Sequence, residues 1–297
     1  MQALTELSLW LISQRHMANI DLITGFLGAG KTTFIRKYAA YLDSIGVSYA
    51  VIENEYGTNG VDSRILQADG ITTDELFGGC ICCTLKVGFH DMLLSLSDKV
   101  DRIIVEPSGV YDISQFFAVM SSTELKKKAS IGNIICIVDP TGLNKLDKLS
   151  VEILKRQVIS AGAVIFSMED DRSYLTLLKS VLGVDGNYIK YNDYNKLYSC
   201  GYKNVELNAE ISHSAEYLSA TVKPLACDNI EQKISELFST DNIGRILRVK
   251  GFWNGYLVNA IDGHIEIIKC DGEDGLNVIG IGISRKKILE VLNNGTV

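Results

Sequence analysis

Gly25-Phe26-Leu27-Gly28-Ala29-Gly30-Lys31-Thr32 is the stretch of sequence that decides the fold. It fits the pattern G-x-x-x-x-G-K-[ST] and lies between an apolar run, residues 20–24, and a helical pattern that begins at Lys31. Glycines let the backbone turn so that successive N–H groups point at phosphate oxygens, and the following helix adds its positive N-terminal end. The flanking elements favour a phosphate-binding loop over a chance glycine-rich turn.

Short apolar runs alternate with helical patterns on both sides of this loop. The predicted strands are residues 20–24, 48–53, 102–106, 133–139 and 163–167. The predicted helices are residues 31–44, 86–97, 113–120 and 146–160. Each strand is nearly continuously apolar, as strands buried on both faces are. The pattern predicts an α/β fold of the P-loop NTPase type, a mostly parallel sheet with helices on both faces and ligands at the carboxyl ends of its strands.

The pattern changes in the last third of the chain. Three β-rich runs, residues 245–252, 256–261 and 264–269, are separated by the hairpin signals Asn254-Gly255 and Asp262-Gly263. A fourth strand is expected at residues 276–282 and a closing helix at 284–293. These elements predict a small C-terminal α+β domain with antiparallel pairing. A further helix is expected at residues 210–221, before this domain.

The expected domains are an N-terminal extension, a nucleotide-binding domain and this C-terminal domain, at residues 1–18, 19–223 and 224–297. The first structural element starts near Ile20, so Met17 is an alternative start and residues 1–16 are expected to be dispensable. They lack the cationic start and long apolar run of a signal peptide. No window approaches the roughly 20 apolar residues that span a bilayer. The formal net charge of −7 argues against nucleic-acid and anionic-membrane partners.

A second candidate for the nucleotide site is the acid that ends the run of residues 102–106. Glu106 stands where the Mg²⁺ shell of a phosphate loop needs negative charge, and Pro107-Ser108-Gly109 follows. We expect Thr32 and Glu106 to hold Mg²⁺, Lys31 to contact the phosphates and the Gly109 amide to sense the γ-phosphate. An acid that merely ends a strand at the surface is the alternative.

The most unusual segment is Gly78-Gly79-Cys80-Ile81-Cys82-Cys83, which places three thiols within four residues. Neighbouring side chains point to opposite sides of an extended chain, so the segment must bend for the sulfurs to converge, and the glycines allow it. Three thiolates suit a soft-accepting ion such as Zn²⁺ or Cu(I). The open fourth position, which Glu53, Glu55, water or a partner could fill, suits an ion that is handed on.

Alternatives to metal binding remain open for these thiols. Cys80 and Cys83 have C-x-x-C spacing, which allows a redox role, whereas a disulfide between adjacent cysteines is strained. The total of 7 cysteines is a poor disulfide framework, and we expect Cys136, Cys200, Cys227 and Cys270 to be small idle thiols. This usage fits a reducing cytoplasm.

Taken together, the motifs resemble those of the CobW-type P-loop GTPases, which include zinc-handling chaperones and cobalamin-synthesis accessory proteins. The matching blocks are GFLGAGKTT at 25–33, NEYG at 54–57, GVD at 60–62, ELFGGCICCTL at 75–85, EPSG at 106–109, VDP at 138–140, RVKGF at 248–252 and VIG at 278–280. The phosphate loop is shared by many NTPases, whereas the C-x-C-C motif is far more specific. The resemblance covers residues 19–294.

The resemblance implies a residue set for each ligand. The nucleotide set is Gly25, Gly28, Ala29, Gly30, Lys31, Thr32, Thr33, Ser108, Gly109 and Asp170. The implied cofactors are GTP, Mg²⁺ at Thr32 and Glu106, and Zn²⁺ or Co²⁺ at Cys80, Cys82 and Cys83. Lys31, Glu55 and Glu106 are the implied catalytic residues, with Glu55 in a switch near the γ-phosphate.

Three departures from the family pattern change these expectations. The guanine-reading N-K-x-D stretch is Ser167-Met168-Glu169-Asp170 here, so Asp170 can still accept from guanine while Met168 lacks the lysine charge. Selectivity for GTP over ATP is therefore expected to be looser. The 4 histidines are unclustered, so no histidine-rich metal reservoir is present. The C-terminal domain is short and has one clear sheet.

The leading functional hypothesis is a slow GTPase that delivers or inserts zinc or cobalt. Its expected partners are GTP and a client metalloenzyme or cofactor-dependent protein, and a homodimer is a candidate assembly. A second hypothesis is a GTP-dependent assembly or reactivation factor for a cofactor enzyme, such as a corrinoid protein, without free-ion transfer. A third is a nucleotide switch whose cysteines bind structural zinc.

Overall fold

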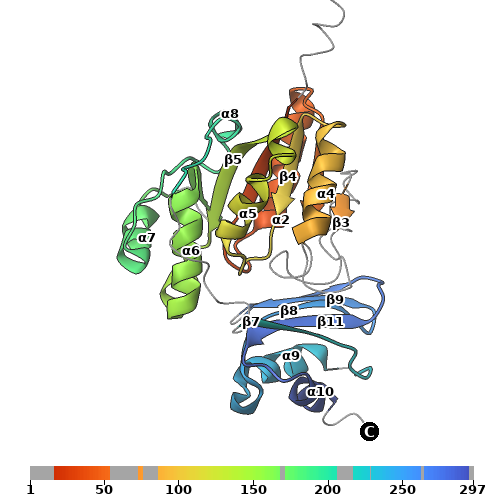
Figure 1. The fold of residues 1–297 in the computed structure, drawn as a ribbon. Coiled ribbons are helices and arrows are strands. Elements are labelled where there is room, and N and C mark those ends of the chain that lie inside the picture. The colour runs from red at the N-terminus through yellow and green to blue at the C-terminus, as the bar shows by residue number, and fades with distance from the viewer. Residues whose placement is uncertain are drawn as a thin grey trace, which may run out of the picture.

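The computed structural model describes residues 17–53, 73–75, 86–167, 171–205, 217–227, 229–261 and 264–293. Within them the chain forms two sheets, each with its own helices (Figure 1). The expected dispensable extension, residues 1–16, lies outside the described residues.

The first sheet has six strands in the order β3-β2-β4-β1-β5-β6, and every neighbouring pair is parallel. Its strands are β1 (Ala18–Thr24), β2 (Tyr49–Glu53), β3 (Thr73–Glu75), β4 (Arg102–Glu106), β5 (Ala129–Val138) and β6 (Ala163–Phe166). The parallel sheet predicted from the sequence is confirmed. β5 begins four residues earlier than predicted, because its first residues pair with the start of β1 before the register shifts.

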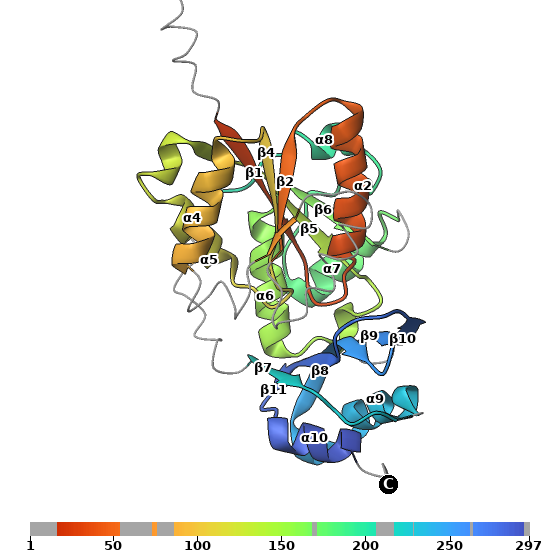
Figure 2. The ribbon, with the colours of Figure 1, turned by 90° about the vertical axis from the view of Figure 1, so that its right-hand side faces the viewer.

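Helices cover both faces of this sheet, as Figures 1 and 2 show. They are α2 (Lys31–Ser44), α4 (Lys86–Ser97), α5 (Ile113–Met120), α6 (Lys148–Ser160), α7 (Tyr174–Leu182) and α8 (Tyr194–Leu197), with 3-10 turns η1 (Leu125–Lys127) and η2 (Leu143–Lys145). Alternating strand residues face opposite cores: Ile103 packs with α4, α5, α6 and α7, and Ile104 packs with α2 and α8. Burial on both faces explains the apolar runs within β2, β4 and β6.

The second sheet is antiparallel, with the strand order β10-β9-β8-β11-β7. Its strands are β7 (Tyr217–Val222), β8 (Arg245–Trp253), β9 (Tyr256–Ile261), β10 (His264–Lys269) and β11 (Gly275–Ile281). The helices α9 (Ile230–Ser239) and α10 (Arg285–Asn293) pack on one face, and the 3-10 turn η4 (Asp241–Ile243) precedes β8. Asn254 and Gly255 have φ angles of 53° and 76°, the left-handed pair that a two-residue hairpin requires.

One predicted element in this region is wrong. The helix expected at residues 210–221 is contradicted in its described part, because Tyr217–Val222 is a strand that pairs with β11. Ala220 and Val222 face the core whereas Ser219 faces away, which is the two-residue period of a strand. The second sheet therefore begins before residue 224. The division into domains stays a prediction, with its boundary moved to precede Tyr217.

Candidate nucleotide-binding site

The glycine-rich loop connects β1 to α2 at the carboxyl end of the first sheet. Gly25, Gly28 and Gly30 have φ angles of 140°, 74° and 89°, which L side chains rarely adopt. A Cβ at Gly25 would also lie 2.2 Å from the carbonyl oxygen of Ile137 in β5. Glycine is therefore required at Gly25 both for its dihedral angle and for close packing on the neighbouring strand.

The N-terminus of α2 is built to receive an anion. Gly30 is its N-cap residue, and no side chain of the described residues caps it. No acidic residue stands in its first turn. The first N–H groups of a helix have no partner within the helix and carry the positive end of its dipole. This end of α2 therefore suits a phosphate group.

Lys31 and Thr32 begin the helix and turn toward the loop and β4. The Lys31 side chain is 5% exposed, and its Nζ donates to the carbonyl oxygens of Gly25 at 3.1 Å and Phe26 at 3.3 Å. The ammonium group is thus held over the concave side of the loop. Thr33 is exposed on the same turn.

Glu106 ends β4 directly beside Thr32. The Thr32 hydroxyl donates to Glu106 Oε1 at 3.0 Å and lies 3.1 Å from Oε2, across 74 positions of sequence. The carboxylate is buried, at 8% exposure. A hydroxyl and a carboxylate are hard oxygen donors of the kind that Mg²⁺ binds beside substrate phosphates. Both residues fit the Mg²⁺ role expected of them.

A row of three glutamates marks the same edge of the sheet. Glu53 pairs in register with Glu106 on one side and with Glu75 on the other, so the strands β3, β2 and β4 all end in glutamate. Glu53 is 3% exposed. Glu53 was expected only as a possible fourth ligand of the thiol site, although it ends an apolar run just as Glu106 does.

The segment after β4 packs against the loop itself. A Cβ at Gly109 would lie 2.4 Å from the backbone nitrogen of Leu27, so only glycine allows this approach. Ser108 is half-buried and its carbonyl accepts from the Tyr111 N–H at 3.0 Å. The structure brings Gly109 to the phosphate loop, while its contact with a γ-phosphate stays a prediction.

Several expected site residues lie outside the described residues: Glu55, Cys80, Cys82, Cys83, Met168 and Asp170. Their roles stay predictions. Ser167, which follows β6, is the last described residue before Met168 and Asp170, and its Cβ lies 3.7 Å from the place a Cβ would take on Gly30. The chain therefore enters the expected base-reading segment beside the phosphate loop.

The four scattered cysteines carry free thiols. Cys136 is buried, Cys200 and Cys227 are partly buried and Cys270 is exposed. Burial raises the thiol pKa of both Cys136 and Cys200 to about 12, which disfavours the thiolate that binds metals. Within the part of the chain that the structure describes, no group of three His, Cys, Asp or Glu residues could hold a metal ion. In that same part, no helix is long and apolar enough to cross a membrane.

A glycine loop between a parallel strand and an open helix end, with a buried lysine and a Thr–Glu pair, defines a P-loop nucleotide-binding protein. A family model described as the CobW/HypB/UreG nucleotide-binding domain matches residues 19–185. The chain belongs to this family, which confirms the resemblance to the CobW-type P-loop GTPases.

Curated relatives match about half of the chain. The zinc chaperone YeiR of Escherichia coli K12 is 32% identical over 158 residues, covering 52% of this chain and 47% of YeiR. The zinc chaperone CobW of Sinorhizobium sp is 34% identical over 149 residues, covering 44% of this chain and 42% of that protein. The zinc-regulated GTPase metalloprotein activator 1 of Saccharomyces cerevisiae is 30% identical over 152 residues, with shares of 48% and 35%. The matches thus span about half or less of each relative's length.

Solved structures also resemble this one. The Zn(II)-bound YjiA GTPase of E. coli is 18% identical with a TM-score of 0.43, and the match covers 93% of this chain and 98% of that one. HypB of Helicobacter pylori in complex with nickel is 18% identical with a TM-score of 0.42, with coverage of 64% and 87%.

Proposed function

We propose that this protein binds and slowly hydrolyses GTP and couples this reaction to the delivery of a thiolate-bound transition metal, zinc or cobalt, to a client protein. The supporting observation is the register of Glu75, Glu53 and Glu106. Glu75 ends β3 at the sheet edge that also carries Glu106, and Cys80 follows five positions later in the sequence. Five residues span at most about 18 Å, which supports a thiol site close enough to the nucleotide site for the two to influence each other.

The residues of the loop account for catalysis by positioning and charge. The Lys31 ammonium and the N–H groups at the start of α2 bind the phosphates and stabilise charge that develops on the γ-phosphoryl oxygens. Thr32 and Glu106 would hold Mg²⁺, which neutralises phosphate charge when bound. Glu55 is the candidate for orienting the attacking water, and Asp170 for accepting from guanine. Cys80, Cys82 and Cys83 would hold the transported ion, and a reducing cytoplasm would keep them as thiols.

The names of the relatives, zinc chaperones and a GTPase metalloprotein activator, support the metal-delivery part of this proposal. The rival function, assembly or reactivation of a cofactor enzyme without free-ion transfer, is favoured by the lack of a histidine cluster. Of the 4 histidines, His90 contacts Ser122 and Asp91, and His264 lines a pocket far in sequence from the thiols.

A test of the proposed function is a two-way titration under anaerobic conditions. The dissociation constant of Zn²⁺ or Co²⁺ is measured with and without GTP, and that of GTP with and without the metal. If the sites are coupled, each ligand changes the affinity of the other by the same factor. Affinities that are independent of each other would reduce the protein to a nucleotide hydrolase with a separate thiol site.

The double variant Cys82→Ser, Cys83→Ser is expected to lose bound transition metal while it still binds GTP. Serine lacks the soft sulfur that these ions prefer, and the phosphate loop is unchanged. Metal content after anaerobic purification is the measurement. The matched control is Cys227→Ser, Cys270→Ser, which changes two free thiols of the C-terminal part and should keep its metal. Unchanged metal content in the first variant would overturn the thiol assignment.

Glu106→Gln is expected to raise the Mg²⁺ concentration for half-maximal GTP hydrolysis by about ten-fold or more, because an amide cannot supply the charge of a metal-holding carboxylate. The substitution keeps the size of the side chain and its contact with Thr32. Hydrolysis measured across a Mg²⁺ series is the readout. The control is Glu290→Gln on the exposed face of α10, which also removes one negative charge. It should leave the dependence of GTP hydrolysis on Mg²⁺ concentration unchanged. An unshifted curve for Glu106→Gln would exclude Glu106 from the Mg²⁺ shell.

A further inference from the structure

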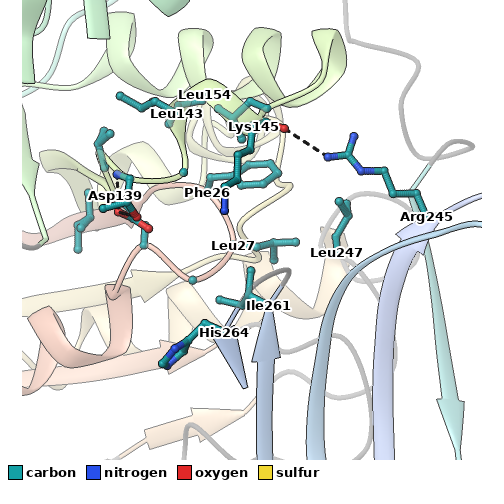
Figure 3. Close-up of a pocket in the computed structure, with 17 residues that line it drawn as sticks. Phe26, Leu27, Asp139, Leu143, Lys145, Leu154, Arg245, Leu247, Ile261 and His264 are labelled. Carbon is teal, nitrogen blue, oxygen red and sulfur yellow. Dashed lines mark hydrogen bonds between the residues drawn. The ribbon is translucent and has the colours of Figure 1, made fainter. Parts of the chain in front are cut away.

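The second sheet packs directly against the phosphate loop. A small apolar cluster joins the two parts of the molecule, and its buried members are Leu27, Val110, Ile153, Leu247 and Ile279. Leu27 is part of the phosphate loop, Val110 follows Gly109, and Leu247 and Ile279 belong to the central strands β8 and β11. Figure 3 shows Leu27, Leu247 and Ile261 facing one another between the loop and the sheet. A residue of the nucleotide site is therefore also a residue of the interface.

The loop and the second sheet approach each other closely at Gly28. A Cβ added to Gly28 would lie 1.9 Å from Cδ1 of Ile261, the last residue of β9. On the other side of the loop, the place of a Cβ on Gly109 is 2.4 Å from the Leu27 nitrogen. The peptide of Leu27 and Gly28 is thus enclosed between the segment that follows Glu106 and the C-terminal sheet.

Next to these contacts, the loop borders a pocket and is not packed against other atoms on that side. A pocket of about 420 Å³ lies between the loop, the segment after β5 and the second sheet, and Phe26, Leu27, Gly28 and Ala29 form one of its walls. Leu247 and Ile261 reach into the same pocket from the sheet (Figure 3). Because atoms next to an open volume lose packing contacts on that side, the side chains from the sheet carry much of the support for the loop.

The sequence motifs RVKGF and VIG lie in β8 and β11, which contribute Leu247 and Ile279 to the apolar cluster at the interface. A Cβ at Gly251 would lie 2.0 Å from the carbonyl oxygen of Gly275, and one at Gly280 would lie 2.3 Å from that of Arg245. These glycines let β8 and β11 approach closely. Because neighbouring side chains of a strand point to opposite faces, Ile279 lies at the interface whereas Val278 joins the core formed with α9 and α10.

A polar contact fixes the edge of the interface. Arg245, the first residue of β8, donates from Nη1 to Asp147 Oδ2 at 2.8 Å and from Nη2 to the Lys145 carbonyl at 3.3 Å. Asp147 is the N-cap of α6, where its other oxygen accepts from the Ser150 N–H. The sheet is thus attached to the helix that contributes Ile153 to the same apolar cluster.

We infer that the C-terminal sheet is a positioning element of the nucleotide site: Ile261 and Leu247 hold Leu27 and Gly28 in the conformation that accepts phosphates. Nucleotide binding and docking of the sheet then stabilise each other, since each favours the same arrangement of the loop. The inference rests on the nucleotide-binding part of the proposed function and is independent of the thiols. A client that contacts this sheet would thereby change the affinity for GTP.

The first test is Ile261→Ala, which should raise the KM for GTP about five-fold or more with kcat nearly unchanged, because the bound nucleotide itself orders the loop at saturation. Val258→Ala is the matched control. Val258 is a fully buried residue of the same strand that faces α9 and α10, so its loss weakens the sheet without touching the loop. Ile261→Leu should restore the KM. Equal KM changes in Ile261→Ala and Val258→Ala would overturn the inference.

The second test is a double-mutant cycle between Gly28 and Ile261. Gly28→Ala strains the backbone at φ 74° and places a methyl group where Cδ1 of Ile261 lies, so GTP affinity should fall. In the Ile261→Ala background the clash between the new methyl group and Ile261 is absent. The loss of GTP affinity caused by Gly28→Ala should then be at least about three-fold smaller, as coupling between residues in contact predicts. In the Val258→Ala background the loss should equal that in the wild-type protein.

The outcomes of the cycle are distinct from those of the proposed function. If the wild-type protein does not bind GTP, the proposed function fails. If it binds GTP and the effects of Gly28→Ala and Ile261→Ala on affinity are independent, the positioning role of the sheet is refuted and the GTP-binding function stands.

Discussion

Lys31→Ala is expected to lower kcat/KM for GTP hydrolysis by about a hundred-fold to a thousand-fold, the effect of removing one preorganised charge-stabilising group. The Lys31 ammonium is buried and held by two carbonyl oxygens of the loop, so it is oriented before the substrate arrives. Because the ammonium group is already in place, it does not have to reorganise during the reaction. A mobile lysine at the surface would not have this advantage. Steady-state kinetics measure the loss of kcat/KM, and the GTP dissociation constant shows how much of that loss is due to weaker binding.

Lys37→Ala is the matched control, because Lys37 lies on the same helix with its Nζ 4.9 Å from the ring centre of Tyr191. It is exposed and points away from the loop, so kinetics close to those of the wild-type protein are expected. A loss of less than about ten-fold for Lys31→Ala would show that the α2 N–H groups suffice for phosphate binding and that Lys31 is not catalytic.

Asp21→Asn is expected to lower the free energy of unfolding by about 3 to 5 kcal/mol, the cost of leaving one partner of a buried ion pair uncompensated. Asp21 lies in β1 with no exposed surface, and its carboxylate accepts from Arg102 of β4, from the Tyr38 hydroxyl and from the Asn133 N–H. Burial raises the pKa of the Asp21 carboxyl, and the guanidinium opposes this effect. Arg102 also stacks on the Tyr198 ring.

An asparagine cannot satisfy these neighbours in either orientation. Its NH₂ group would face either the Arg102 guanidinium or the Asn133 donors, and a donor would then meet a donor. Urea unfolding measures the effect. Asp98→Asn is the control, because Asp98 pairs with Lys128 at the surface, with side chains 61% and 39% exposed, and such pairs contribute at most about 1 kcal/mol. Equal losses in the two variants would show that the Asp21–Arg102 pair is not a stability determinant.

The Asp21–Arg102 ion pair could not be predicted from local sequence patterns. Residues 20–24 and 102–106 were predicted as apolar strands, and neither Asp21 nor Arg102 was assigned a partner. Only the parallel pairing of β1 with β4, and of β1 with β5, brings Asp21, Arg102 and Asn133 together. The same limit applies to Glu53, whose register with Glu106 no local pattern reports.

Local chemistry determined the part of the structure that the sequence predicted well. The loop of Gly25, Gly28 and Gly30 and the hairpin at Asn254-Gly255 depend on backbone angles that few residue types adopt. Buried parallel strands need continuous apolar runs, so β1, β2, β4, β5 and β6 were predicted to within a few residues, whereas the polar strand β3 was not predicted. These signals act over a few positions of the chain and need no knowledge of distant partners.

Tertiary structure alone decided the strand at Tyr217–Val222 and the side of the second sheet that meets the phosphate loop. The strand at Tyr217–Val222 forms because it pairs with β11, about sixty positions later in the chain. The side of the second sheet that meets the phosphate loop depends on the contact between Ile261 and Gly28, which are more than two hundred positions apart. A strand gains its hydrogen bonds from its neighbour and not from its own sequence, and which of two apolar faces is covered depends on the shape opposite it. Such choices are made by packing between remote segments.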